Sequence, residues 1–275
     1  MNKLLVILGP TSTGKTNLGL LLAKKFNGEL VSADSRQVYK NLDIGTGKMP
    51  ENGQFKKGKG FWEFNKIKIW MYDVISPKRQ YNVANYVKDA EKVISEIIKK
   101  GKLPIIVGGT GLYIKALIDG LSNLSVPFDK KLRKNLEKLT LNDLQEKLGK
   151  LSKKKWESLN YSDQQNPRRL IRTIELVLLK PKEIKTQDSA FKNFNILKIG
   201  LTAPRDILYK KSNDRVISRM EQGMVEEAQR LQSGISLKRF RQLGLEYGIL
   251  ADYLEGKIKN EDLLINILQL KIHGY

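Results

Sequence analysis

The sequence has 275 residues, of which 40% are hydrophobic, which suits one large domain or a core with one smaller partner. It contains no cysteine and one histidine, His273, which excludes disulfides, thiolate metal sites, cysteine nucleophiles, histidine triads and zinc sites built on several histidines. No run approaches the ~18 apolar residues of a membrane span, and the five apolar residues after Lys3 are too few for a signal peptide. We therefore expect a cytoplasmic protein with no membrane partner.

The formal net charge is +21, and the pI is about 9.9. Composition leaves two interpretations open: a polyanionic partner, or a lysine-rich proteome in which lysine covers every surface. Residues 121–185 have the highest charge density, with 16 basic and 8 acidic side chains. Nucleic-acid binding by this segment would depend strongly on salt, because phosphate contacts release counterions.

The first predicted elements are a strand, a helix and a second strand. The apolar run from Lys3 to Leu8 ends at Gly9 and indicates a buried strand. Leucines at helical spacing predict a helix over residues 15–26, and residues 29–32 predict the second strand. Strands that alternate with helices are typical of a parallel sheet.

The next segment, residues 45–60, is rich in glycine and lysine, and we expect a mobile loop there. Residues 67–74 predict a third strand. A helix with a clear apolar stripe follows, capped by Asn82 and ended by Gly101. Residues 103–107 form a further apolar strand.

Beyond Leu121 charged helical patterns replace the strands, and strand character returns only at residues 196–201. Residues 205–272 again predict helices, with Asn260 as the cap of the last one. The simplest architecture is a parallel α/β core of residues 1–120 and 190–275, with helices on both faces and a basic helical insertion at residues 121–189.

The strongest motif is Gly9-Pro10-Thr11-Ser12-Thr13-Gly14-Lys15-Thr16, which matches G-x-x-x-x-G-K-[ST] between a predicted strand and helix. Its glycines let backbone N–H groups wrap a phosphate, and the helix N-terminus adds its positive end. Lys15 supplies a cation, and the Thr16 hydroxyl is a potential Mg²⁺ ligand. The core is therefore P-loop NTPase-like. ATP is the usual ligand of such a loop, so a kinase or NTPase is the first alternative.

Two polar segments follow predicted strands, whose carboxyl ends should face the phosphate loop. Asp34-Ser35-Arg36-Gln37 offers a carboxylate for Mg²⁺ or a proton, and donors for a phosphate or base edge. Alone, it is equally consistent with a polar loop whose aspartate caps a helix. Gly108 to Tyr113 allows close backbone approach and places Thr110 in the cleft. No apolar run ends in the Asp-Glu or Asp-x-x-Gly signature of many NTPases, which disfavours ATP hydrolysis.

Arginines recur in two helical patterns. Arg168, Arg169 and Arg172 lie opposite an apolar stripe, with Arg168 and Arg172 on one face; a solvated helix face is the alternative. Arg215 and Arg219 follow Pro204-Arg205, and one of them could reach a diphosphate from a facing helix.

In this order, the motifs resemble the tRNA dimethylallyltransferase family, also called tRNA isopentenyltransferase, over essentially the whole chain. The resemblance implies transfer of a dimethylallyl group from dimethylallyl diphosphate to the N6 amine of the tRNA adenosine 3′ of the anticodon. The loop then holds a prenyl diphosphate rather than ATP, with Mg²⁺ as cofactor. The adenosine must leave its stack, so the enzyme looks like a base-flipping one. Nothing in the sequence demands more than a monomer.

The resemblance also implies residue roles. Asp34 takes the proton, and Thr13, Lys15 and Arg215 complete the catalytic set around the departing diphosphate. Residues Gly9 to Thr16 bind the diphosphate, with Thr16 as metal ligand. The implied tRNA-binding residues are Asp34, Ser35, Arg36, Gln37, Thr110, Arg168, Arg169, Leu170, Ile171, Arg172, Arg241 and Gly244.

The sequence departs from the family pattern in two places. The usual Gly-Tyr-x-Glu reads Gly244-Leu245-Glu246, and the family's basic Lys-Arg-Gln-x-Thr-Trp segment is missing after Tyr275, through truncation or natural shortening with weaker tRNA binding. Two other functions stay open: a P-loop small-molecule or nucleotide kinase using ATP, and a P-loop RNA-binding protein without catalysis.

Overall fold

The structure is a computed structural model that describes residues 2–49, 54–124, 126–179 and 189–274. Its contacts divide the chain into two compact units, Met1–Asp119 with Ser189–Tyr275, and Gly120–Asp188. Each unit has a hydrophobic core of its own. The predicted end of the helical insertion, at residues 180–188, lies outside the described residues.

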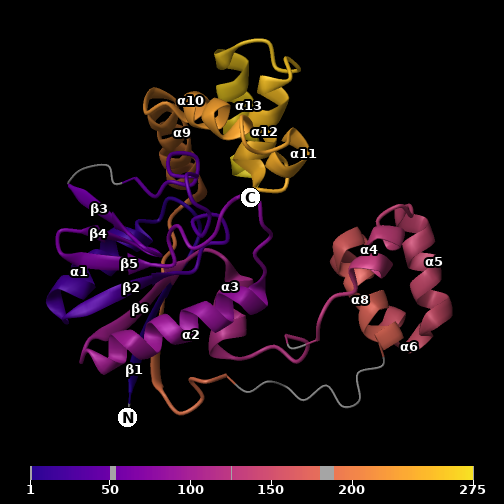
Figure 1. The fold of residues 1–275 in the computed structure, drawn as a ribbon, viewed down its shortest axis with the longest axis horizontal. Coiled ribbons are helices and arrows are strands. Elements are labelled where there is room, and N and C mark those ends of the chain that lie inside the picture. Colours follow the sequence, from indigo (N-terminus) through magenta and orange to yellow (C-terminus); the bar gives the residue numbers. More distant parts are fainter. Residues whose placement is uncertain (1, 50–53, 125, 180–188, 275) are drawn as a thin grey trace. The chain divides into compact units, whose positions relative to one another are not determined.

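The larger unit is built around one seven-stranded sheet (Figure 1). The order across this sheet is β3-β4-β5-β2-β6-β1-β7, and β5, β2, β6, β1 and β7 run parallel. The central strands β1 and β6 are buried along most of their length, which explains their nearly continuous apolar runs. The strands are β1 (Lys3–Leu8), β2 (Gly28–Ser32), β3 (Phe55–Gly58), β4 (Phe61–Phe64), β5 (Ile67–Trp70), β6 (Leu103–Gly108) and β7 (Asn195–Gly200).

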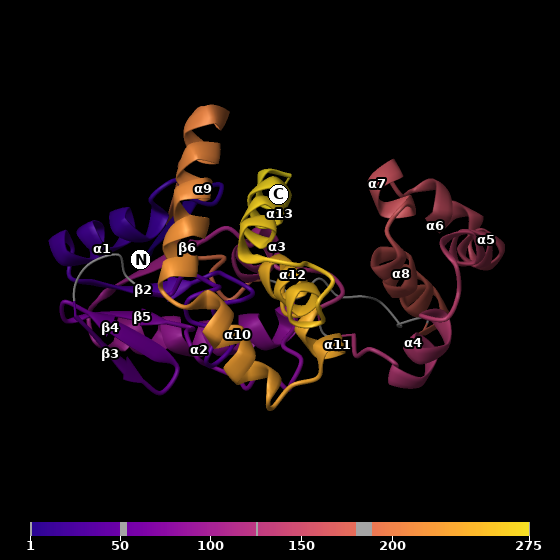
Figure 2. The ribbon, with the colours of Figure 1, turned by 90° about the horizontal axis from the view of Figure 1, so that it is seen from above.

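Helices cover both faces of this sheet (Figure 2). Helix α1 (Lys15–Lys25) joins β1 to β2, whereas α2 (Val83–Lys99) leads from β5 to β6 and packs against α3 (Gly111–Ile118). The two crossovers run in opposite directions along the sheet, and right-handed crossovers of opposite direction place their helices on opposite faces. Asn82 caps α2 as predicted, by accepting from the Asn85 N–H. The predicted P-loop-like α/β core is therefore confirmed.

An antiparallel hairpin corrects the expectation of a loop throughout residues 45–60. Within that segment, β3 pairs with β4 across a two-residue turn, and β4 pairs with β5. The rings of Phe55 and Trp62 stack across the hairpin with centroids 4.8 Å apart. Aromatic cross-strand pairs stabilise short strands, and a local excess of glycine and lysine does not reveal them.

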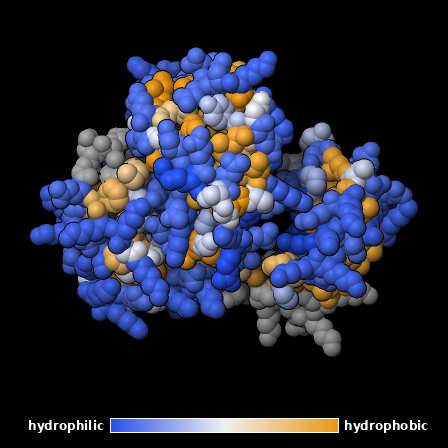
Figure 3. Space-filling view, turned by 45° about the horizontal axis from the view of Figure 1, so that its top comes forward, coloured by the Kyte–Doolittle hydropathy of each residue, from blue (hydrophilic) through white to orange (hydrophobic). Residues whose placement is uncertain are grey.

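The C-terminal helices build a second apolar core within the larger unit. This core encloses Val38, Tyr39 and Leu42, which follow β2 in the chain. Asn260 caps the last helix as predicted. Apolar residues gather over these helices in Figure 3, where much of the remaining surface is hydrophilic. The helices are α9 (Arg205–Glu221), α10 (Met224–Gln232), α11 (Leu237–Phe240), α12 (Leu245–Leu254) and α13 (Glu261–His273).

All regular elements in the described residues of the smaller unit are helices. Leu144, Leu148, Leu170 and Ile174 lie at the centre of its core. No helix in the described parts of either unit is long and apolar enough to cross a lipid bilayer. The helices of the smaller unit are α4 (Lys130–Leu136), α5 (Leu141–Leu151), α6 (Lys153–Glu157), α7 (Tyr161–Gln164) and α8 (Pro167–Leu179).

Gly9 is predicted to be indispensable for the stability of this core. Its φ is +149°, and a Cβ atom there would lie 2.3 Å from the Leu201 carbonyl oxygen, which is backbone and cannot rotate away. Gly9→Ala should lower the free energy of unfolding in urea by about 1–3 kcal/mol. Gly200→Ala is the control, because its Cβ would meet open space. Equal stability of the two variants would contradict this account.

Candidate active site

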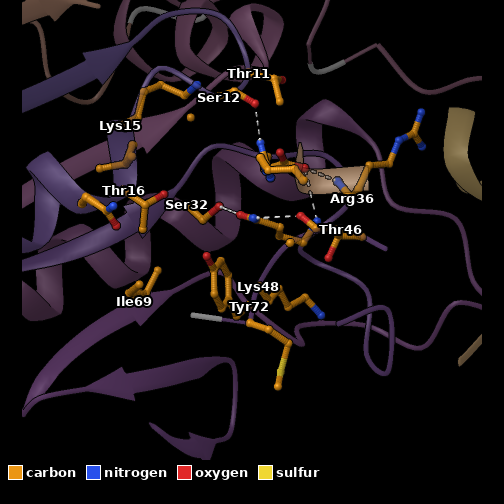
Figure 4. Close-up of a pocket in the computed structure, with 18 of the residues that line it drawn as sticks. Thr11, Ser12, Lys15, Thr16, Ser32, Arg36, Thr46, Lys48, Ile69 and Tyr72 are labelled. Carbon is orange, nitrogen blue, oxygen red and sulfur yellow. Dashed lines mark hydrogen bonds between the residues drawn. The ribbon is translucent and has the colours of Figure 1, made fainter. Parts of the chain in front are cut away.

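The strand ends that carry the predicted motifs meet at one cavity of about 850 Å³ in the larger unit (Figure 4). They meet because parallel neighbours present their carboxyl ends on the same edge of a sheet. The phosphate loop, the residues after β2, residues 44–49 and one side of α9 line this cavity. The predicted site residues in its lining are Thr11, Ser12, Gly14, Lys15, Thr16, Asp34, Arg36, Gln37 and Arg215.

The phosphate loop is shaped by hydrogen bonds within itself. Gly14 adopts a left-handed conformation (φ 82°) directly before α1, so the loop turns straight into the helix N-terminus. The Thr13 hydroxyl and the Lys15 ammonium both donate to the Pro10 carbonyl oxygen, at 2.9 and 2.5 Å. Thr13 therefore stabilises the loop from outside the cavity lining, whereas Lys15 and Thr16 line the cavity.

A second cation reaches the loop from α9. Arg215 donates to the Ser12 hydroxyl at 3.2 Å. Burial, and then the positive charge of Arg215, lower the pKa of Lys15 from 10.5 to about 8, while Asp34 acts in the opposite direction. An anion between these two cations would relieve both the desolvation and the repulsion, so the cavity favours an anionic ligand.

Asp34 lines the same cavity, half-buried. Its Oδ1 accepts from the backbone N–H groups of Arg36 and Gln37, at 2.7 and 3.3 Å, which fixes the turn after β2. The Ser35 N–H donates to the Thr110 hydroxyl at 3.1 Å, so the two polar segments predicted to face the phosphate loop are joined. The charge of Asp34 also acts on Lys15 and tends to raise its pKa, because the carboxylate and the phosphate loop line the same cavity.

The neighbouring side chains of this segment point in different directions. The Gln37 side chain bridges β2 to the cavity wall, because it accepts from the Ser32 hydroxyl at 2.8 Å and donates to the Thr46 carbonyl at 3.3 Å. Arg36 extends away from Ser32 and Thr46 (Figure 4), donates to the Gln242 carbonyl at 3.3 Å and packs against Gly244. Arg36 and Gly244, both predicted to bind tRNA, thus lie side by side.

Other residues predicted to contact RNA already form ion pairs within the protein or are buried. Arg241 forms ion pairs with Asp252 and Glu255 on α12 and its C-cap. In the smaller unit, Leu170 and Ile171 are buried, so their side chains face its core and not a ligand.

The arginine strip of α8, predicted to contact tRNA, is unevenly exposed. Arg172 donates to the carbonyls of Asn123 and Val126 and pairs with the buried Glu175, so protein groups engage its guanidinium within the smaller unit. Arg169 forms an ion pair with Asp163, and Arg168 is exposed. These two are the arginines of the strip that solvent reaches most easily.

Residues 44–49, which form one wall of the cavity, were not predicted to be part of the site. Gly47 has a φ of +66°, and a Cβ there would lie 2.8 Å from Arg215 Nη2 and 2.3 Å from Arg219 Nη2. Only a glycine lets the two guanidinium groups approach this closely. The closely spaced glycines of Gly45-Thr46-Gly47 are the sequence feature that could have indicated this wall. Instead, residues 45–60 were predicted to form a mobile loop.

Fold and cavity together define a P-loop α/β protein in which a phosphate loop and a carboxylate line one cavity. A profile of the family described as IPP transferase matches residues 37–275. The chain is 38% identical to a tRNA dimethylallyltransferase of Endomicrobium trichonymphae, over 95% of this chain and 85% of that one, and 40% identical to one of Pelotomaculum thermopropionicum, over 94% and 81%. The crystal structure of a tRNA isopentenylpyrophosphate transferase from Bacillus halodurans matches with a TM-score of 0.68 and 34% identity, over 100% and 84%. The chain therefore belongs to the IPP transferase family.

Binding of inorganic diphosphate should be linked to the protonation of Lys15. With a pKa of about 8, roughly half of Lys15 is neutral at pH 8 in the free protein, and a bound anion raises this pKa by favouring the ammonium. Binding near pH 8 should therefore take up roughly 0.5 proton through Lys15, and affinity should fall as pH rises above 8. Calorimetry in buffers of different ionisation enthalpy measures the uptake.

The control for the protons of diphosphate itself is Lys15→Arg, whose guanidinium stays charged. The wild type should take up more protons than this variant at pH 8, and the difference should vanish near pH 6, where Lys15 is already charged. Identical proton counts at pH 8 would show that Lys15 does not titrate on binding.

Proposed function

We propose that the protein transfers a dimethylallyl group from dimethylallyl diphosphate to N6 of the adenosine 3′ of the anticodon in tRNA, releasing diphosphate. The observation that carries this proposal is the placement of Lys15 and Asp34 in the lining of one cavity. Relatives at 34–40% identity bear the names of enzymes of this kind. A cytoplasmic location and a monomeric state remain predictions.

The phosphate side of the cavity would stabilise the leaving group. As the bond between the prenyl carbon and the diphosphate oxygen breaks, negative charge grows on the diphosphate. Lys15 and Arg215, with the N–H groups at the start of α1, are positioned to interact with that charge more strongly as it develops. The Thr13 hydroxyl would contribute by holding the loop in shape.

Asp34 would act as the base for the incoming amine. The exocyclic N6 amine of adenosine is a poor nucleophile, and its attack on the prenyl carbon leaves a proton that must be removed. Asp34 Oδ1 is held by two backbone N–H groups, which orients the carboxylate toward the cavity. Transfer of the proton to the carboxylate balances the reaction: the C–N bond forms, the C–O bond breaks, and diphosphate leaves.

Mg²⁺ would be held by the Thr16 hydroxyl together with oxygens of the diphosphate. Thr16 fits this role, because its hydroxyl oxygen lies in the first turn of α1, directly after Lys15, in the cavity lining. Hard oxygen donors suit Mg²⁺, which commonly binds through one or two protein groups and substrate phosphates. When bound, the ion would add positive charge beside the diphosphate.

The tRNA would contact the rim formed by Arg36, Gln242 and Gly244, together with the exposed Arg168 and Arg169 of the smaller unit. A base that reacts at N6 must leave its stack to enter the cavity. The excess of basic side chains supports binding to the phosphate backbone, which would weaken as salt is raised.

Asp34→Asn is expected to separate chemistry from binding. Asparagine can still accept the two backbone N–H groups, but its amide does not take a proton. In an assay with labelled dimethylallyl diphosphate and unmodified tRNA, kcat should fall about 10²–10⁴-fold. The dissociation constant for tRNA should stay near that of the wild type.

Asp119→Asn is the matched control, because Asp119 is an exposed aspartate outside the cavity lining that pairs with Lys198. Its turnover should equal that of the wild type. Near-normal turnover of Asp34→Asn would refute the base assignment, and retention of tRNA by the wild type without any product would favour a non-catalytic RNA-binding protein.

Ligand-induced stabilisation distinguishes the prenyltransferase from an ATP-dependent kinase. Dimethylallyl diphosphate with Mg²⁺ should raise the melting temperature by about 5 °C at one hundred times its dissociation constant, and ATP should raise it less. Lys15→Met should abolish the shift, which verifies that the phosphate loop causes it. A larger shift with ATP would favour the kinase.

A further inference from the structure

The wall of the cavity at residues 44–49 is a loop that no strand holds in place. It lies between β2 and β3, outside the ladder of the sheet. Its position therefore depends on contacts with other elements. Two buried charged groups supply these contacts, one at each end of the loop: Glu227 from α10 and Lys48 within the loop itself.

Glu227 binds the first end of the loop. It is 5% exposed, and its Oε2 accepts from the N–H groups of Asp43 and Ile44, both at 2.8 Å. Its Oε1 accepts from the Gly45 N–H at 3.0 Å and from the Tyr247 hydroxyl at 2.7 Å. All four donors are neutral groups. Three of them are consecutive backbone N–H groups, so this one buried carboxylate orders three consecutive peptide units. Hydrogen bonds to a charged acceptor are the stronger kind.

The Gly45 peptide is held from both sides. Glu227 accepts from the Gly45 N–H, and Arg219 donates to the Gly45 carbonyl oxygen at 3.0 Å. Arg219 also lies 3.7 Å from Glu246 of α12. Two residues further along, Gly47 allows the guanidinium groups of Arg215 and Arg219 to approach the loop. A shift of the loop would therefore move cations of the cavity relative to the phosphate loop.

Lys48 anchors the other end. Its ammonium is fully buried and donates to the Tyr39 carbonyl and to Asp73, both at 2.6 Å, and to Asp43 at 3.1 Å. Because the contacts of Lys48 with Tyr39 and Asp73 do not involve Glu227 or its partners, loss of the Glu227 carboxylate should displace the loop locally rather than unfold the unit. This separates a positioning role from a general contribution to stability.

We propose that Glu227 is a positioning residue for the diphosphate donor: its carboxylate fixes the backbone of Asp43–Gly45, and through it the arginines of α9 in the cavity. The proposal rests on the proposed function, because it concerns the donor side of the same site. It predicts that Glu227 determines affinity for the diphosphate while remaining outside contact with it.

Glu227→Gln tests this role. Glutamine has one acceptor oxygen, and its NH₂ group would face N–H groups that need an acceptor. The dissociation constant for inorganic diphosphate, measured by calorimetry, should rise about tenfold or more. The KM for dimethylallyl diphosphate should rise by a similar factor, while the KM for tRNA stays within about threefold.

Glu29→Gln is the matched control. Glu29 is an equally buried carboxylate of the same unit, 2% exposed, which accepts from Trp70 at 2.6 Å and Lys102 at 2.7 Å and lies outside the cavity lining. Both substitutions should lower the melting temperature, but only Glu227→Gln should weaken diphosphate binding. Equal diphosphate affinities of the two variants, or equal rises of both KM values in Glu227→Gln, would reduce Glu227 to a structural residue.

Gly45→Ala provides a second test if Glu227→Gln does not fold. A Cβ at this position would lie 2.6 Å from the Tyr247 hydroxyl oxygen, so it should push the loop away from α12 while keeping the carboxylate. The same selective loss of diphosphate affinity is expected, and a folded variant with wild-type affinity would overturn the proposal. Because diphosphate binding needs no transfer, this comparison stays valid even if the wild type transfers no prenyl group.

Discussion

The path of the chain directly after β2 is the constraint on which the site depends. Ser35 and Gln37 remain at the edge of the sheet, because the Ser35 N–H donates to the Thr110 hydroxyl and the Gln37 side chain accepts from the Ser32 hydroxyl. A few residues later, Val38, Tyr39 and Leu42 are buried among the C-terminal helices. One short segment thus belongs to two packed regions at once. This arrangement brings α9, with its arginines, against a phosphate loop that lies about two hundred residues earlier in the chain.

The electrostatics of the cavity follow from that proximity. Lys15 is placed where burial and Arg215 both disfavour its charge, and the nearby Asp34 compensates only in part, so its pKa remains well below 10.5. A site that destabilises its own cation is one in which an anionic ligand gains most from binding. The carboxylate is needed in the same space for a different reason, since it must receive a proton there. Cation and carboxylate therefore have to share one cavity without neutralising each other through a direct ion pair.

The parts of this site that could be predicted from sequence are those fixed by short-range rules. The phosphate loop matches a contiguous pattern, and the pairing of Ser35 with Thr110 follows because parallel strands end at one edge. The contact between Glu227 and Asp43 spans 184 residues and leaves no local pattern, because a glutamate in the first turn of a helix is common on any surface. The contacts of Arg172 could not be predicted for the same reason: its position on α8 follows from helical spacing, but its partners, Asn123 and Val126, lie in a connecting segment without periodicity.

The departure from the family pattern after Gly244 is consistent with the same reasoning. Where the family usually has Gly-Tyr-x-Glu, this chain continues Gly244-Leu245-Glu246-Tyr247, and the two polar side chains find partners in the cavity wall. Glu246 lies 3.7 Å from Arg219, and the Tyr247 hydroxyl donates to Glu227 at 2.7 Å. These two partners, Arg219 and Glu227, both form hydrogen bonds with Gly45, so the altered segment of α12 supports the loop. The residues after Gly244 therefore belong to the wall on the donor side of the cavity, while Gly244 itself packs against Arg36 at the rim.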